Sequence, residues 1–164
     1  MANSNKKDDF VFFWGGSFSN FSVVRGGIDY LGENFPTSEH CFMYAKAKQF
    51  NDEEIARQIV NARTPKDAKR LGRKVKGYKD EEWSKVRYEI MKDINLLKYT
   101  QSKYHNQELK RTGNKHLVEA SPFDDIWGIK MRATDKGVEN PKNWKGQNLL
   151  GKVLMEVREE LFNK

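Results

Sequence analysis

A succession of helix-start signals between residues 36 and 80 restricts this chain to a mainly helical fold. Serine, threonine and aspartate are favoured just before a helix, because their side chains accept hydrogen bonds from backbone N–H groups that lack a partner in the first turn. The signals are Thr37 or Ser38 after Pro36, then Asp52, then Thr64 before Pro65, and finally Asp80. They predict helices over about 38–50, from 53, from 65 and over about 81–102.

Apolar residues at helical spacing support the longest of these helices and a further helix near residue 150. The predicted stripe of helix 81–102 consists of Trp83, Val86, Ile90, Ile94 and Leu97, and that of helix 147–162 of Leu150, Val153, Leu154, Val157 and Leu161. A shorter helix is predicted over 104–112, ending at Gly113. Helices therefore cover most of the chain after residue 37.

The β structure is predicted to be small and to lie mainly before the first helix. The aromatic run 10–14 has the composition of a strand. Residues 21–24 and 28–31 flank Arg25-Gly26-Gly27 and are predicted to form a hairpin. Residues 116–120 are predicted as one more short strand.

One hydrophobic core suffices for a chain of 164 residues, of which 37% are hydrophobic and 12% aromatic. The predicted fold class is mainly α (α+β), with a single compact helical domain over residues 10–164 and a small N-terminal antiparallel β element. Residues 1–9 are predicted to be disordered, and residues 131–146 to form a long polar loop.

Composition argues against several classes of protein. The chain has no run of about 18 apolar residues that could span a membrane, and MANSNKKDDF lacks the apolar stretch of a signal peptide. Cys41 is the only cysteine, which rules out an internal disulfide and favours a reducing, cytoplasmic location. The three histidines and Cys41 show no zinc spacing. We expect a monomer with no cofactor, no metal and no membrane contact, although a carboxylate-bound metal stays open.

The net charge of +7 comes from one stretch of the chain. Residues 63–79 hold eight basic residues and one acidic residue, a net +7, so that the remainder carries 22 of each sign and is neutral. This basic stretch is either an ordinary solvated face or a patch that attracts phosphates or a nucleic-acid backbone.

The predicted helix 38–50 carries two charges on an apolar stripe. Glu39, Met43, Lys46 and Phe50 fall within about 40° of one another on a helical wheel. Glu39 and Lys46 are two turns apart, roughly 10 Å along the axis. They either line one pocket or extend outward at the margin of a broad stripe.

The stretch SPFDDIWGIK, residues 121–130, sets two adjacent carboxylates among apolar side chains. Asp124 and Asp125 follow Pro122, as in a turn, because aspartate bonds nearby backbone groups and proline fixes φ. The alternative is a carboxylate held against aromatic surface, where its environment tunes its pKa for chemistry.

Five stretches, in order, together resemble the NADAR superfamily, also called YbiA-like, over about residues 10–162. They are Ser19-Asn20-Phe21, PTSEHCFMYAK from Pro36 to Lys46, AKRLGR from Ala68 to Arg73, Ser121-Pro122 with Asp124 and Trp127-Gly128, and GQNLLGK from Gly146 to Lys152. The resemblance implies an N-glycosidase that cleaves the bond between a ribose C1′ and a nitrogen. One branch of the family acts on phosphorylated ribosylamino-pyrimidine or pyrimidinone intermediates of riboflavin synthesis, and another removes ADP-ribose from guanine, including guanine in DNA.

The resemblance also implies site residues. The implied catalytic residues are Glu39, Lys46 and Asp124, and the implied substrate-binding residues are Ser19, Asn20, Phe21, Trp83, Trp127 and Asn148. We expect Arg70, Arg73 and Lys74 to contact phosphate or nucleic acid, and we assign Asp125 to the turn. These catalytic residues, with Asn20 and Trp127, are expected to converge on one cleft.

Such residues suit cleavage of an N-glycosidic bond. A carboxylate near C1′ stabilises the positive charge that develops there, and a second acid can protonate the leaving nitrogen. An unprotonated lysine can instead form a Schiff base with C1′ of an opened ribose. The basic stretch favours ADP-ribosylated guanine in nucleic acid as substrate over a phosphorylated ribosyl-nitrogen metabolite. A binding module for ADP-ribose or nucleic acid that performs no turnover is the third reading.

Overall fold

The computed structural model describes residues 6–163, which form two compact units. The helical unit comprises residues 20–106, and the terminal unit comprises residues 6–19 together with 107–163. The helices are α1 (Ser38–Gln49), α2 (Glu53–Val60), α3 (Pro65–Gly72), α4 (Asp80–Gln101), α5 (Lys103–Arg111) and α6 (Leu149–Phe162), and the strands are β1 (Phe10–Phe13), β2 (Ile28–Tyr30), β3 (Glu33–Phe35) and β4 (His116–Glu119). Two 3₁₀ turns span Lys6–Asp9 and Pro141–Asn143.

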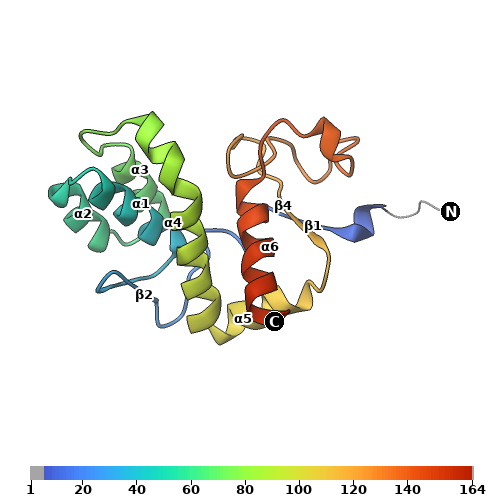
Figure 1. Cartoon of the computed structure of the whole chain (residues 1–164), viewed down its shortest axis with the longest axis horizontal. Helices are drawn as coiled ribbons and strands as arrows, with labels where there is room; N and C mark the ends of the chain where they lie inside the picture. Colours follow the sequence, from blue (N-terminus) through green and yellow to red (C-terminus); the bar gives the residue numbers. More distant parts are fainter. Residues whose placement is uncertain (1–5, 164) are drawn as a thin grey trace. The chain divides into compact units, whose positions relative to one another are not determined.

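Helix α1 is the central element of the helical unit. It packs against α2, α3 and α4, and the antiparallel hairpin β2–β3 covers it as well (Figure 1). Because neighbours surround it, every residue of α1 from Ser38 to Ala45 is buried, including the polar Ser38, Glu39 and His40. Glu39 therefore lies on a part of α1 that has no solvated face.

Side chains cap the helices where the sequence predicts it. Thr37, Asp52 and Thr64 accept hydrogen bonds from the backbone N–H groups of His40, Ile55 and Asp67, respectively. These bonds satisfy N–H groups that a first turn leaves free. The predicted starts of α1, α2 and α3 are confirmed.

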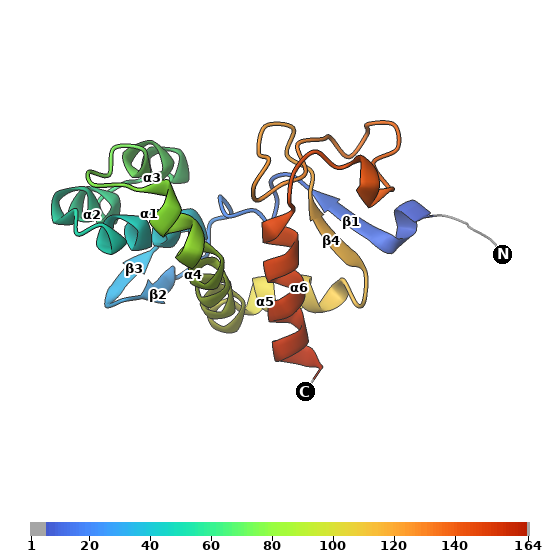
Figure 2. The ribbon, with the colours of Figure 1, turned by 45° about the horizontal axis from the view of Figure 1, so that its top comes forward.

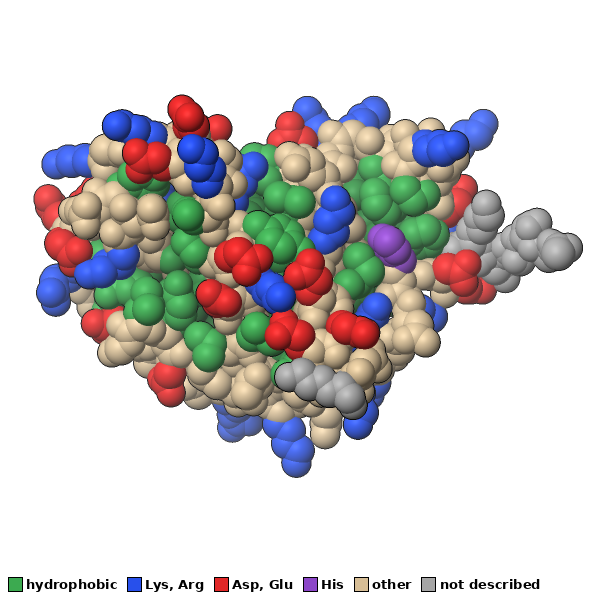
Figure 3. Space-filling view, in the orientation of Figure 1, with side chains coloured by type: hydrophobic (Ala, Val, Ile, Leu, Met, Phe, Trp, Pro, Cys, Tyr) green, Lys and Arg blue, Asp and Glu red, His purple; other side chains and the backbone are tan. Residues whose placement is uncertain are grey.

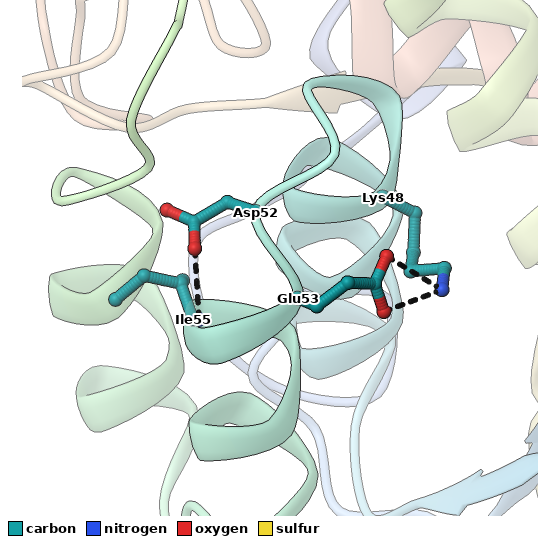
Figure 4. A network of polar contacts seen from close by, with 4 residues as sticks. All are labelled: Lys48, Asp52, Glu53 and Ile55. Atoms are coloured by element: carbon teal, nitrogen blue, oxygen red, sulfur yellow. Dashed lines mark hydrogen bonds and ion pairs between the residues drawn. The ribbon is translucent and has the colours of Figure 1, made fainter.

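Asp52 also links the corner between α1 and α2 to the basic stretch. Its second carboxylate oxygen accepts a hydrogen bond from the backbone N–H of Lys76 at 2.8 Å. Beside it, Lys48 Nζ donates to both carboxylate oxygens of Glu53, at 2.9 and 3.0 Å (Figure 4). The bonds from Lys76 and then Ile55 lower the pKa of Asp52, because they stabilise its charged form. The chain between α3 and α4 is thereby attached to the end of α1.

Gly72 allows α3 to approach α1 closely. A Cβ atom at this position would overlap Sδ of Met43, which is buried on α1. A larger residue would require the Met43 side chain to move or the last turn of α3 to shift away from α1.

The terminal unit is built on a short parallel pair of strands. β1 pairs with β4 in the register Phe10 to His116, and α6 packs along β4 (Figure 2). The core cluster beneath this pair consists of Val118, Ala120, Ile129, Met131 and Val138, with Phe10, Phe12 and Trp144 partly buried against it. The ladder is extended by one bond, from Ala120 N–H to Phe13 O at 2.7 Å, so that the chain leaves both strands at the same edge.

The predicted fold class is confirmed: the described residues are mainly helical, with small sheets that include an antiparallel hairpin before α1. The position predicted for the hairpin is wrong, because β2 pairs with β3 around Leu31 and Gly32, and residues 21–24 form no strand. Both Leu31 and Gly32 have positive φ, the geometry of a tight hairpin turn. The loop at Gly26-Gly27 instead carries a backbone bond from Gly27 N–H to Val24 O.

The face of α4 that is buried differs from the predicted stripe. Trp83 and Ile94 are buried as expected, but Val86, Ile90 and Leu97 are only half-buried. The rest of the buried face consists of Met91, Asn95, Lys98 and Tyr99. Two polar residues therefore occupy positions that an apolar pattern cannot reveal.

Two predictions about the extent of the domain are not settled by these elements. The predicted disordered segment covers residues 1–9, of which 1–5 lie outside the described residues and Lys6–Asp9 form a 3₁₀ turn. That residues 10–164 act as one domain stays a prediction.

Candidate active site

Asn20 holds the beginning of α1. Its side-chain Oδ1 accepts a hydrogen bond from Ser38 Oγ at 2.9 Å, and its backbone oxygen accepts one from the N–H of Glu39 at 2.9 Å. Asn20 and Glu39, both predicted from the sequence, are thus brought together. The side chain of Glu39 lies within the unit, with 8% of the residue exposed.

Lys46 lies two turns further along α1 and is half-buried. Burial lowers the pKa of its amine, and the charge of Arg73 lowers it further, while Glu39 and Asp80 act in the opposite direction. The net direction is downward, which increases the share of unprotonated amine at neutral pH. The charge of Glu39 thus acts on Lys46, while the expectation that both side chains line one pocket stays a prediction.

A chain of aromatic rings supports Lys46. Its Nζ lies 4.4 Å from the ring centroid of Tyr78, and that ring packs against Phe50 at 5.4 Å. Phe50 in turn packs against Trp83 at 6.4 Å, and Trp83 packs against Phe42 at 5.1 Å. Trp83 is 5% exposed, so in this structure it supports the aromatic rings that pack beside Lys46. Its predicted contact with substrate stays a prediction.

Tyr78 was not identified from the sequence. Its hydroxyl donates to Asp80 Oδ1 at 2.7 Å, which fixes the ring over Lys46 at the start of α4. The one available signal was its position within the basic stretch, two residues before a helix start.

The basic stretch lies beside this pair of charges. Arg70, Arg73 and Lys74 are exposed, and lysine and arginine side chains lie on the surface over α3 (Figure 3). Arg70 faces Asp67 at 3.7 Å, a separation at which an exposed ion pair contributes little. Lys69 Nζ lies 5.8 Å from the ring centroid of Phe21, which is 40% exposed. The helical unit therefore brings together Asn20, Phe21, Glu39, Lys46 and the cations of α3.

Asp124, in the terminal unit, holds a turn. Its Oδ1 accepts hydrogen bonds from the backbone N–H groups of Ile126 at 2.9 Å and Trp127 at 2.8 Å. Asp125 is exposed and contributes a backbone oxygen, which accepts from Gln147 N–H at 2.9 Å. The assignment of the turn to the Asp125 side chain is therefore wrong. Asp124 closes the turn, because the N–H groups that need an acceptor lie two and three residues after it. The same bonds fix the direction of the Asp124 carboxylate.

Asn148 joins α6 to β4. Its Oδ1 accepts from Glu119 N–H at 2.9 Å, and its Nδ2 donates to Leu117 O at 3.0 Å. Its backbone has a φ of 54°, a left-handed conformation that asparagine tolerates better than most residues. Both ends of the buried side-chain amide form hydrogen bonds with β4, so Asn148 has a structural role. Its predicted contact with substrate stays a prediction.

The other predicted site residues of the terminal unit are Ser19 and Trp127. Ser19 is 8% exposed, and its backbone N–H donates to Gly16 O at 3.1 Å. Trp127 is half-buried and follows the Asp124 turn directly. Their roles, and the expected convergence of the site residues on one cleft, stay predictions.

Neither a metal cluster nor a membrane span is found in the described part of the chain. Between residues 6 and 163, no three His, Cys, Asp or Glu side chains gather in a way that could hold a metal ion. Over the same residues, no helix is long and apolar enough to cross a membrane.

Comparison with known proteins places this architecture in a family. Residues 6–162 match the family model described as the NADAR domain. The chain is 42% identical over 132 residues to protein irg-1 of Caenorhabditis elegans, a match that spans 79% of this chain and 62% of that protein.

Two further relatives are named for an activity. The N-glycosidase of Acanthamoeba polyphaga mimivirus is 38% identical over 165 residues, covering 93% of this chain and 96% of its own length. Escherichia coli N-glycosidase YbiA is 34% identical over 146 residues, covering 89% of this chain and 81% of its own length. The NMR structure of YbiA matches with a TM-score of 0.75 at 31% identity, over 94% of this chain and 85% of that one.

Proposed function

We propose that this chain, which belongs to the NADAR family and is by that membership an N-glycosidase, acts on guanine that carries ADP-ribose. The modified guanine is part of a nucleic acid or of a nucleoside. The enzyme hydrolyses the bond between ribose C1′ and the guanine nitrogen and releases ADP-ribose.

The position of Lys46 carries the proposal. A half-buried amine with a lowered pKa, near the Glu39 carboxylate and beside an exposed cationic surface, suits attack on a ribose whose phosphates lie outside the helix packing. Arg70, Arg73 and Lys74 can bind the phosphate backbone of the nucleic acid that carries the modified guanine.

We assign Lys46 the role of nucleophile. The ribose ring opens when the C1′–O4′ bond breaks, O4′ takes a proton and C1′ forms an iminium with the guanine nitrogen. The amine adds to C1′, its proton passes to the guanine nitrogen, which leaves, and a Schiff base joins C1′ to Lys46. Water then adds to C1′ and the amine leaves, which regenerates Lys46 and releases ADP-ribose. Glu39 transfers protons in both steps. Asp124 is assigned to stabilising positive charge at C1′. In a direct hydrolysis by water, Asp124 and Glu39 would instead act as the catalytic pair.

A panel of three substrates tests the proposal. Purified protein is incubated with ADP-ribosylated guanosine, with an ADP-ribosylated DNA oligonucleotide, and with a ribosylamino-pyrimidine phosphate, and products are followed by mass spectrometry. We expect free ADP-ribose from the first two. Cleavage of the pyrimidine compound alone would assign the enzyme to riboflavin intermediates, and binding without cleavage of any substrate would make the chain a binding module.

Salt dependence tests the basic stretch. Neutralising Arg70, Arg73 and Lys74 together should reduce the slope of log affinity against log salt for the modified oligonucleotide, because each bound phosphate releases counterions. The slope should fall by about one for each phosphate that the variant no longer binds. Turnover of the free nucleoside should change little by comparison. The matched control neutralises Lys103, Lys110 and Lys115, which lie outside the stretch, and should leave the slope as it is. An affinity independent of salt in the unaltered protein would refute the role of this surface in binding a polynucleotide.

The catalytic role assigned to Asp124 is tested by removing its charge while keeping the hydrogen bonds that close the turn. Asp124→Asn keeps a side-chain oxygen for the N–H groups of Ile126 and Trp127 but removes the charge. We expect it to retain the melting temperature within a few degrees and to lose turnover by about 100-fold. Asp124→Ala should lose turnover and also stability, by about 1 kcal/mol. Asp125→Ala should retain most activity. Full turnover in Asp124→Asn would restrict Asp124 to the turn.

A further inference from the structure

Two aromatic side chains in the terminal unit are exposed beside each other. Trp14 is 58% exposed and Phe123 is 76% exposed, and their ring centroids lie 5.7 Å apart at an interplanar angle of 65°. Large rings that remain in water forgo the stabilisation that burial gives. A contiguous exposed apolar surface usually marks a site of interaction.

The fold fixes this pair in place. Trp14 follows the end of β1, and Phe123 lies three residues after Ala120, whose N–H extends the strand ladder to Phe13 O at 2.7 Å. Both rings therefore stand where the two parallel strands end. Gly15 and Gly16 follow Trp14 directly. A Cβ atom added to either glycine would have no atom of the described residues within 4 Å, apart from those of its own neighbours in the chain. Space around the pair is thus left open by the two glycines.

Two exposed cationic side chains lie on the segments that follow the Asp124 turn. Lys130 and Lys145 are both exposed, and Lys145 N–H donates to Ile129 O at 2.9 Å, which places them on adjoining segments. The loop that carries Lys145 is held against the turn, since Gln147 N–H donates to Asp125 O at 2.9 Å. From residue 121 to residue 152, a range that includes the two aspartates of the turn, the chain has six basic and four acidic residues, a net +2. Rings for stacking and cations for phosphates together are typical of surfaces that bind single-stranded nucleic acid.

We propose that Trp14 and Phe123 form a stacking platform for an unpaired nucleobase of a single-stranded polynucleotide, and that Lys130 and Lys145 bind its phosphates. This inference deepens the proposed function and rests on it for the identity of the substrate, because it names a single strand as the form in which the modified guanine is presented. The platform itself binds unmodified bases.

Binding of an unmodified oligothymidylate, measured by fluorescence anisotropy, tests the platform. Trp14→Ala and Phe123→Ala should each weaken binding by about 5-fold or more, the cost of losing one stacked base. Trp14→Phe should retain most of the affinity, which separates stacking from a folding defect. Tyr104→Ala is the matched control, since Tyr104 is 60% exposed but belongs to the helical unit, and it should bind as the unaltered protein does.

An oligonucleotide of equal length whose positions are abasic isolates the contribution of the bases. It should bind more weakly and equally well to the unaltered protein and to both alanine variants. Changing Lys130 and Lys145 to alanine should lower the salt slope by about 1.4, because each phosphate contact on a single strand contributes about 0.7. The proposal is overturned if the unaltered protein does not bind oligothymidylate, if the aromatic variants bind it equally well, or if Tyr104→Ala loses as much affinity.

Turnover separates this inference from the proposed function. Loss of oligothymidylate affinity in the Trp14 and Phe123 variants, with no ADP-ribose released from any substrate, supports the platform and refutes the proposed activity. Release of ADP-ribose from the modified oligonucleotide at an unchanged rate and affinity in both variants supports the activity and refutes the platform.

Discussion

Glu39→Gln is expected to lower turnover of ADP-ribosylated guanosine by about 100-fold or more, because amides do not transfer protons as carboxylates do. Glutamine has nearly the same shape as glutamate, and the bond from Glu39 N–H to Asn20 O involves only the backbone. The variant should therefore fold, with a melting temperature close to that of the unaltered protein. Steady-state kinetics should show the loss mainly in kcat.

The same variant has a second readout at Lys46. The negative charge of Glu39 raises the pKa of Lys46 against the effects of burial and Arg73. Removing that charge should lower the pKa of Lys46 further, so the amine should lose its proton at lower pH, as an NMR titration of Lys46 can measure. The control is Glu81→Gln, since the Glu81 side chain is 87% exposed, and it should leave both turnover and the titration unchanged. Full activity in Glu39→Gln would contradict the proposed proton transfer.

Stability is expected to depend on a buried lysine. Lys98 of α4 is 0% exposed, and burial lowers its pKa from 10.5 to about 7. Below pH 7 the folded and unfolded chains both carry the charge, and the folded chain bears the cost of burying it. Above pH 7 the unfolded chain binds more protons than the folded chain at this residue, so stability should rise with pH. The rise is at most about 1.4 kcal/mol per pH unit.

The window for this measurement is set by the groups around Lys98. Cys41 and Tyr30, whose pKa values burial raises to about 12, begin to act with the opposite sign as their unfolded forms ionise above about pH 8.5. Burial lowers the pKa of His105 to about 4, so its effect lies mainly below pH 6.5. Lys46, whose pKa is also lowered, acts with the same sign as Lys98. Between pH 7 and about 8.5, the part of the slope that is lost when Lys98 is replaced should therefore report Lys98.

Lys98→Met tests this account by thermal unfolding across the window. The positive slope of stability with pH should flatten in the variant. Its melting temperature should therefore rise less across the window than that of the unaltered protein, by about 2–4 °C for each kcal/mol of pH-dependent stability that Lys98 supplies. Lys85→Met is the control, because the Lys85 side chain is 72% exposed, and it should preserve the slope. A lower melting temperature with an unchanged slope in Lys98→Met would show that the buried charge is not the cause.

Local signals in the sequence predicted the helices well. The caps at Thr37, Asp52 and Thr64 act over three residues and depend on nothing distant, so their positions follow from the sequence. The pairing of β1 with β4 joins segments about a hundred residues apart and has no local signature. The hairpin was misplaced because two turn signals, Gly26-Gly27 and Leu31-Gly32, compete within a few residues.

The surroundings of Lys46 could be predicted only in part for the same reason. Helical geometry alone sets Glu39 and Lys46 on one stripe of a helix, whereas Tyr78 reaches Lys46 from a different segment. The burial of Lys98 could not be predicted, because a lysine breaks the apolar pattern that marks a buried face. Choosing between Asp124 and Asp125 depended on which carboxylate meets the N–H groups of the turn, a matter of backbone geometry.

Lys46 as the nucleophile is the central claim, and reductive trapping tests it most directly. Borohydride added during turnover of ADP-ribosylated guanosine reduces a Schiff base to a stable amine. Peptide mass spectrometry should then find the ribosyl adduct on Lys46, and Lys46→Arg, which does not deprotonate at working pH, should be nearly as inactive as Lys46→Ala. An active Lys46→Arg variant together with no adduct on Lys46 in the unaltered protein would contradict the claim.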